Sequence, residues 1–184
     1  WVRESGLLIN DGTGRLAFRP LPRIAQTAPA FGVVVSDLNV DGRADVYLVQ
    51  NREHAGQSPD PASGGLSLLL IGTGDAAHPL MPVWPDDSGL VLFGQGRGVA
   101  TVDLNDDDRA DLVVGLNEND PAAFVNVMGD GDHQPFKVSL LEPGRIAAGA
   151  RVTVTCDGMP PQIAEYHAGG GFLSQSAPVL FFAA

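Results

Sequence analysis

The segment "GVVVSDLNVDGRADVYLVQN" (Gly32–Asn51) occurs a second time as "GVATVDLNDDDRADLVVGLN" (Gly98–Asn117). The second copy begins 66 residues after the first, and ten of the twenty aligned positions are identical. In each copy, apolar and β-branched residues that suit strands flank a polar loop of nine residues. The repeat therefore predicts a structural unit in which two strands are joined by an acidic hairpin loop.

A second pattern is interleaved with the first. Apolar residues followed by a Gly-containing turn occur in "LLINDGTGRLAF" (Leu7–Phe18), "SLLLIGTGDAAHPL" (Ser67–Leu80) and "FVNVMGDGDHQPF" (Phe124–Phe136). Glycine reaches positive φ at little cost, so each segment predicts a β-hairpin. A nucleotide-binding glycine loop is disfavoured because no βαβ unit surrounds these turns. Four strands per period predict an all-β fold of propeller-like blades, a partial propeller of roughly three four-stranded units.

The pattern changes after Pro143. "GARVTVTCDG" (residues 149–158) and "PQIAEYHAGGGFLSQSAPVLFF" (residues 161–182) predict a terminal hairpin, a Gly-rich turn and a last strand. We therefore expect propeller repeats over residues 1–142 and a separate C-terminal β module over residues 143–184. The Pro- and Gly-rich segments at residues 56–65 and 81–89 are predicted to be loops.

The acidic loops predict two calcium sites. Calcium prefers six to eight oxygen ligands, and side chains at alternate loop positions converge on one point. Loop positions 1, 3 and 5 offer side-chain oxygens, position 7 a backbone carbonyl and position 9 a carboxylate. The predicted ligands are Asp37, Asn39, Asp41, the Arg43 carbonyl and Asp45 in one loop, and Asp103, Asn105, Asp107, the Arg109 carbonyl and Asp111 in the other.

Two alternatives concern these loops. An EF-hand is excluded because Leu48 and Val114 stand where its position-12 Glu would be, and because the flanks are predicted strands. A metal-free turn, in which Asp and Asn cap backbone amides, stays open. Repulsion among the carboxylates favours a cation, whereas Asp108, standing where the first loop has Gly42, weakens the prediction for the second loop.

Composition excludes several classes of function. The formal net charge is −11 and Lys137 is the only lysine, which opposes nucleic-acid binding. No apolar stretch approaches the ~18 residues of a membrane span. Cys156 is the only cysteine, so an internal disulfide is impossible and thiol ligation of zinc is disfavoured. The chain begins at Trp1 and shows no signal-like segment, so we expect a piece of a longer protein.

Catalysis is not predicted. The carboxylates already have a role as metal ligands, and their spacing repeats in both loops, whereas a catalytic pair is normally unique. The four His residues share no motif with each other or with a Ser, and Ser174 and Ser176 lack a nucleophile-elbow context. A propeller-type hydrolase or lyase acting on glycans is the alternative that stays open, since carboxylate separation cannot be obtained from sequence.

Two family resemblances cover most of the chain. "FGVVVSDLNVDGRADVYLVQN" (Phe31–Asn51) and "GRGVATVDLNDDDRADLVVGLN" (Gly96–Asn117) resemble the FG-GAP/VCBS repeats of integrin-α-like β-propellers. "GARVTV" (Gly149–Val154) followed by "GGGFLSQSAP" (Gly169–Pro178) is similar to the ASPIC/UnbV module, which follows FG-GAP repeats in cartilage acidic protein and in bacterial secreted proteins. The final "LFFAA" departs from the usual ending of that module.

These resemblances imply calcium-supported blades in a secreted, periplasmic or cell-surface protein that serves adhesion or recognition. The expected partner is a protein or glycan ligand of unspecified identity, with no nucleic acid and no membrane span. Too few blades for a closed ring would leave an exposed strand edge, so self-association through an open propeller edge is also expected.

Overall fold

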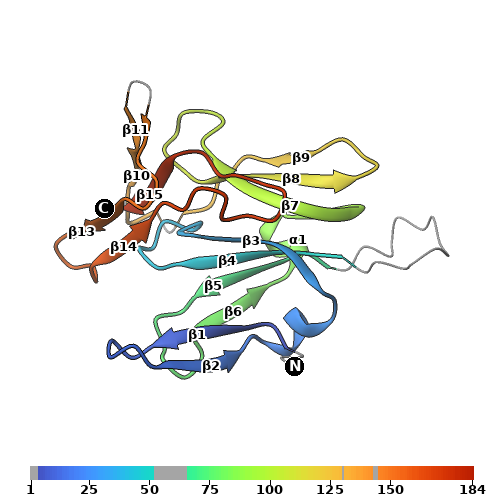
Figure 1. Cartoon of the computed structure of the whole chain (residues 1–184), viewed down its shortest axis with the longest axis horizontal. Helices are drawn as coiled ribbons and strands as arrows, with labels where there is room; N and C mark the ends of the chain where they lie inside the picture. Colours follow the sequence, from blue (N-terminus) through green and yellow to red (C-terminus); the bar gives the residue numbers. More distant parts are fainter. Residues whose placement is uncertain (1–3, 52–65, 130, 143–144) are drawn as a thin grey trace.

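The computed structural model describes residues 4–51, 66–129, 131–142 and 145–184. The predicted all-β class is confirmed, with 45% of the described residues in strands and 5% in helices. Several antiparallel sheets form an open arrangement, and the described residues form no closed barrel (Figure 1). The predicted loop at residues 56–65 lies outside the described residues.

The first repeat forms a four-stranded antiparallel sheet. Its strands follow one another in sequence order: β3 (Ala30–Ser36), β4 (Asp45–Gln50), β5 (Leu68–Gly72) and β6 (Leu80–Val83). Sequential pairing gives the meander expected of a blade. In Figure 1 this sheet lies between the N-terminal hairpin and the sheet of the second repeat.

The second repeat forms only three strands. They are β7 (Gln95–Val102), β8 (Asp111–Asn117) and β9 (Ala122–Phe124). The predicted hairpin at Phe124–Phe136 is wrong, because β10 (Pro135–Ser139) pairs with β15 (Val179–Ala183) and β9 pairs with β8. The physical reason is aromatic packing: the rings of Phe136 and Phe182 stack with centroids 5.6 Å apart. The expected third four-stranded unit is therefore absent from the described residues.

The remaining elements are short. The predicted hairpins at Leu7–Phe18 and Ser67–Leu80 are confirmed as the pairs β1–β2 and β5–β6. Pro85 and Gly89, with φ of 72°, start and end a one-turn helix where a loop was predicted. The bounds are β1 (Gly6–Asn10), β2 (Leu16–Pro20), the 3₁₀ helix η1 (Arg23–Gln26), α1 (Pro85–Ser88), β11 (Leu141–Glu142), β12 (Arg145–Ile146), β13 (Arg151–Val154) and β14 (Gln162–Glu165).

Strand β4 is the centre of the N-terminal core. Its side chains alternate between the two faces of the sheet, as they must in a strand. Val46 and Leu48 pack in one cluster with Leu21 and Ala25, whereas Tyr47 belongs to the core shared with the β7–β8 sheet. Because both faces are covered, all six residues of β4 are buried.

Strand β15 joins two cores in the same way. Phe181 packs in the core between the two repeats, whereas Leu180 and Phe182 pack with Tyr166 in the C-terminal cluster. The predicted terminal hairpin is confirmed as the pair β13–β14. The pairing of β15 with β10 crosses the predicted boundary between residues 142 and 143, and it attaches the C-terminal segment to the second repeat.

Candidate metal-binding loops

The two acidic hairpin loops have the same backbone shape. The first loop (Asp37–Asp45) joins β3 to β4, and the second loop (Asp103–Asp111) joins β7 to β8. Position 4 is left-handed in both, with φ of 61° at Val40 and 60° at Asp106. Position 6 is left-handed as well, with φ of 78° at Gly42 and 66° at Asp108. Positive φ is unusual outside glycine, so this shared pattern must be held by other interactions.

The carboxylate at position 1 holds each loop by capping backbone amides. Asp37 accepts hydrogen bonds from the N–H groups of Asp41, at 3.2 Å, and Gly42, at 2.8 Å. Asp103 accepts the equivalent bonds from Asp107 and Asp108, at 3.3 and 3.0 Å. Both acidic turns therefore contain amide caps, which form the local basis of the turn.

The carboxylate at position 9 fastens each loop to a neighbouring segment, which is β5 for the first loop and the residues after β9 for the second. Asp45 and Asp111 have no solvent exposure. Asp45 accepts from the N–H groups of Leu38 and Gly72, both at 2.8 Å. Burial, partly opposed by these two hydrogen bonds, raises the pKa of Asp45 to about 6. Asp111 accepts from the N–H groups of Leu104 and Asn126, both at 2.7 Å.

Asn39 at position 3 of the first loop has an unsatisfied oxygen. Its Nδ2 donates to Asp41 at 3.1 Å, but its Oδ1 is buried without a hydrogen-bond partner. A buried polar atom without a partner costs about 1–3 kcal/mol. Burial also raises the pKa of Asp37, so its ionised form is incompletely compensated. Hard cations take oxygen ligands. The first loop offers two such oxygens in need of a partner, the Asn39 amide oxygen and the Asp37 carboxylate, so it fits a hard cation.

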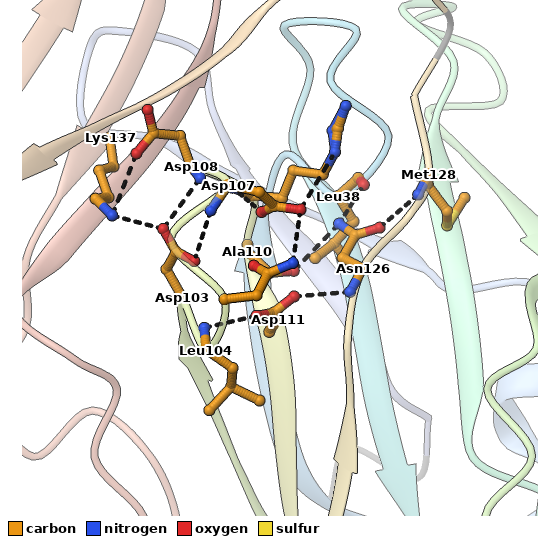
Figure 2. Close-up of polar contacts among 12 residues, drawn as sticks. Leu38, Asp103, Leu104, Asp107, Asp108, Ala110, Asp111, Asn126, Met128 and Lys137 are labelled. Carbon is orange, nitrogen blue, oxygen red and sulfur yellow. Dashed lines mark hydrogen bonds and ion pairs between the residues drawn. The ribbon is translucent and has the colours of Figure 1, made fainter.

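A positive charge from another strand, the Lys137 ammonium of β10, contacts the second loop. The Lys137 Nζ lies 2.6 Å from Asp103 Oδ2 and 3.2 Å from Asp108 Oδ1 (Figure 2). It also lies 3.4 Å from Asp106 Oδ1. Burial pushes the pKa of Asp103 upward, but Lys137 and two backbone amides outweigh it, so that pKa is lowered. The hydrogen bond to Asp103 in turn raises the pKa of Lys137. The second loop therefore does not fit a metal as the first loop does.

Asn126 connects the two loops. It lies after β9, and its Nδ2 donates to the carbonyls of Leu38 at 2.8 Å and Ala110 at 3.1 Å (Figure 2). Its own backbone N–H is the donor to Asp111. Sequence reasoning missed Asn126, because the equivalent donor in the first repeat is the backbone of Gly72 and no side-chain pattern marks it. Lys137 was also missed, although its being the only lysine was a usable signal.

Position 6 of each loop contacts a later part of the chain. A β-carbon at Gly42 would collide with the end of the Met159 side chain and lie 3.5 Å from the side chain of Gln162. Gln162 in turn bonds Ala183 of β15 through both its side-chain nitrogen and its oxygen. In the second loop, Asp108 at position 6 contacts Lys137 of β10. The first loop therefore lies against the C-terminal module, whereas the second loop contacts β10, the strand that pairs with β15 of that module.

The structure brings the side chains predicted for each site into one loop. Asn105 Nδ2 donates to Asp107 at 3.0 Å, as in the first loop, and Arg43 and Arg109 donate their backbone N–H groups to the position-5 carboxylates. Ligation by the Arg43 and Arg109 carbonyls stays a prediction. In the part of the chain that the structure describes, no group of three or more His, Cys, Asp or Glu side chains has an arrangement that could hold a metal ion. Any cation in the first loop would therefore also need amide, carbonyl or water oxygens.

These features define an open all-β protein with two acidic turns of the same backbone shape, the first packed against a C-terminal β module and the second against β10, which pairs with that module. The family model described as ASPIC and UnbV matches residues 141–184, so this part of the chain is similar to that family. The comparison with curated proteins gave no match. Among the described residues, no helix has the length and apolar character needed to cross a membrane.

Proposed function

We propose that this chain is a calcium-stabilised interaction module of a secreted or cell-surface protein, with the calcium in the first loop. The buried, unpartnered Oδ1 of Asn39 carries the proposal, because it supplies an unused oxygen in the same loop as the Asp37 and Asp41 carboxylates. A bound cation would satisfy that oxygen and neutralise Asp37. Weak loop sites fill best at extracellular calcium concentrations, which supports a location outside the cytosol.

The resemblance to FG-GAP/VCBS repeats supports the same function. Each repeat has the acidic nine-residue loop between adjacent antiparallel strands, and the first repeat has a four-stranded meander. The C-terminal match to ASPIC and UnbV is consistent with a module of a secreted or surface protein. We propose adhesion or recognition, with a protein or glycan ligand, as the role of this module.

A cleft beside the first loop offers a place for such a ligand. It has a volume of about 590 Å³ and lies between β3 and the C-terminal module. Asp37 and Gly42 of the first loop line it, together with Gln162 and Tyr166 from the opposite side. A calcium ion that orders the first loop would also order one wall of this cleft, which links metal binding to recognition.

Calcium titration tests the metal. We expect isothermal titration calorimetry to detect calcium binding and differential scanning calorimetry to show a higher melting temperature in calcium than in EDTA. A ligand at 10 to 100 times its Kd stabilises the native state by about 1.4 to 2.7 kcal/mol. For a domain of this size that corresponds to several degrees, at about 2–4 °C per kcal/mol.

Two substitutions make the titration specific. Asp37→Asn should remove the calcium-dependent rise in melting temperature because it deletes the charge at position 1. Asp87→Asn is the matched control: Asp87 is an exposed acid in α1, outside both loops, and its loss should leave calcium binding unchanged. Wild-type protein that shows neither binding heat nor a shift in melting temperature would overturn the calcium proposal.

A further inference from the structure

The two acidic loops differ at only two of their nine positions. Val40 of the first loop corresponds to Asp106 of the second, and Gly42 corresponds to Asp108. Both differences add a carboxylate to a loop that already contains Asp103, Asp107 and Asp111. Without compensation, two more negative charges would make the second loop the less stable of the pair.

The negative charge of the second loop is compensated by Lys137, the only lysine of the chain. Asp106 and Asp108, the two extra acids, each form an ion pair with Lys137. Asp103 at position 1 forms the shortest pair, at 2.6 Å, and Figure 2 shows the pairs with Asp103 and Asp108. An ammonium group has three N–H donors, so one lysine can serve three carboxylates. The Asp103 side chain is 4% exposed and the Lys137 side chain 28%, so the carboxylate end of this pair is shielded from solvent.

We propose that Lys137 supplies the cation of the second loop from within the chain, so that this loop folds without metal and only the first loop takes calcium. The ammonium lies against the position-1 carboxylate, which a metal in this loop would also need. The one-calcium stoichiometry rests on the proposed function of the first loop, whereas the role of Lys137 in the second loop does not.

The contact between Lys137 and the second loop also attaches strands β10 and β15 to that loop. Lys137 belongs to β10, which pairs along its length with β15. The ammonium therefore fixes the β10–β15 pair to the second loop without calcium. The first loop instead meets the C-terminal segment through the packing of Gly42 on Met159 and Gln162. Of the two contacts, only the one made by the first loop is expected to respond to calcium.

Calcium stoichiometry tests the proposal. Equilibrium dialysis should give one calcium per chain for the wild type, one for Lys137→Arg and two for Lys137→Met, because the neutral variant frees the second loop for a metal. Two ions on the wild type would overturn this inference and leave the proposed function standing. No ion on the wild type and one on Lys137→Met would support this inference and overturn the calcium proposal for the first loop. Equal stoichiometry in the wild type and Lys137→Met would overturn the inference.

Two further measurements serve if Lys137→Met does not fold. In the background of intact Lys137, Asp37→Asn should abolish calcium binding and Asp103→Asn should leave it within about twofold of the wild type; loss of binding in Asp103→Asn would overturn the inference. Protein labelled with ¹³C at lysine Cε gives a single resonance, because the chain has one lysine. Calcium should leave that resonance in place, and its displacement at saturating calcium would show that metal enters the second loop.

Discussion

The first and second loops share seven of nine residues and the same pattern of left-handed residues, yet their carboxylates are compensated differently. At position 1, burial raises the pKa of Asp37, whereas Lys137 and backbone amides lower the pKa of Asp103. The shape of such a loop is thus determined locally, by amide caps that both copies contain. Its charge balance is determined by a residue from another strand, which only one copy meets.

The contact with Lys137 explains why the second loop has Asp108 at position 6, where the first loop has Gly42. Glycine is favoured there because φ is positive, and the first loop has Gly42 at 78°. The second loop accepts Asp108 at 66° because Asp tolerates this region better than most residues and because its carboxylate reaches Lys137 at 3.2 Å. A repeat can therefore lose a conformationally favoured residue where a new ion pair offsets the strain.

The largest effect is expected at position 9, where the two loops are alike. Asp45→Ala and Asp111→Ala should each lower the free energy of unfolding by about 2–5 kcal/mol, because the first leaves three and the second two backbone N–H groups without their acceptor. Urea unfolding in EDTA measures both variants, with Asp87→Ala as the exposed control. If one loop tolerated the substitution with a loss below about 1 kcal/mol, the structural equivalence of the loops would be broken.

The sequence predicts what depends on local chemistry. The all-β class, the loop positions and two of the three glycine-marked hairpins follow from strand residues, amide-capping acids and glycine at positive φ. The third hairpin failed because its two segments pair elsewhere: β9 with β8, and β10 with a strand more than 40 residues later in the chain. Pairing over that distance depends on packing of Phe136 and Phe182, which no local pattern contains.

The same limit applies to the site. The residues at positions 1, 3, 5 and 9 of each loop were predicted from their spacing alone, and the structure places them in one turn. Lys137 and Asn126 were missed because they reach the loops from β10 and from the segment after β9. Whether a loop needs metal depends on such tertiary neighbours, so two nearly identical motifs predicted two equivalent sites although their surroundings differ.

A smaller effect is expected at position 6, where the loops differ. Gly42→Ala should destabilise the protein by about 1–2 kcal/mol, because alanine is strained at positive φ and Met159 must move aside. Asp108→Gly should change the stability by less than about 1 kcal/mol, because the relief of backbone strain offsets the loss of a half-exposed ion pair. Thermal unfolding in EDTA compares them. A larger loss for Asp108→Gly than for Gly42→Ala would show that the ion pair, and not backbone strain, dominates at this position.

The smallest effect concerns the arginines at position 7. Arg43 Nη1 lies 3.3 Å from Asp41 Oδ2, and the Arg43 side chain is 43% exposed, so Arg43→Met should change stability in EDTA by less than about 1 kcal/mol. Its effect on calcium should be clearer: removing a positive charge close to the first loop should raise calcium affinity about two- to fivefold at low ionic strength and less in high salt. Arg109→Met is the matched variant in the second loop and should leave the measured affinity unchanged, because the calcium lies in the first loop. An equal rise in calcium affinity in both variants would mean that both loops bind calcium. Lys137 would then lie beside a second calcium ion and would not replace it.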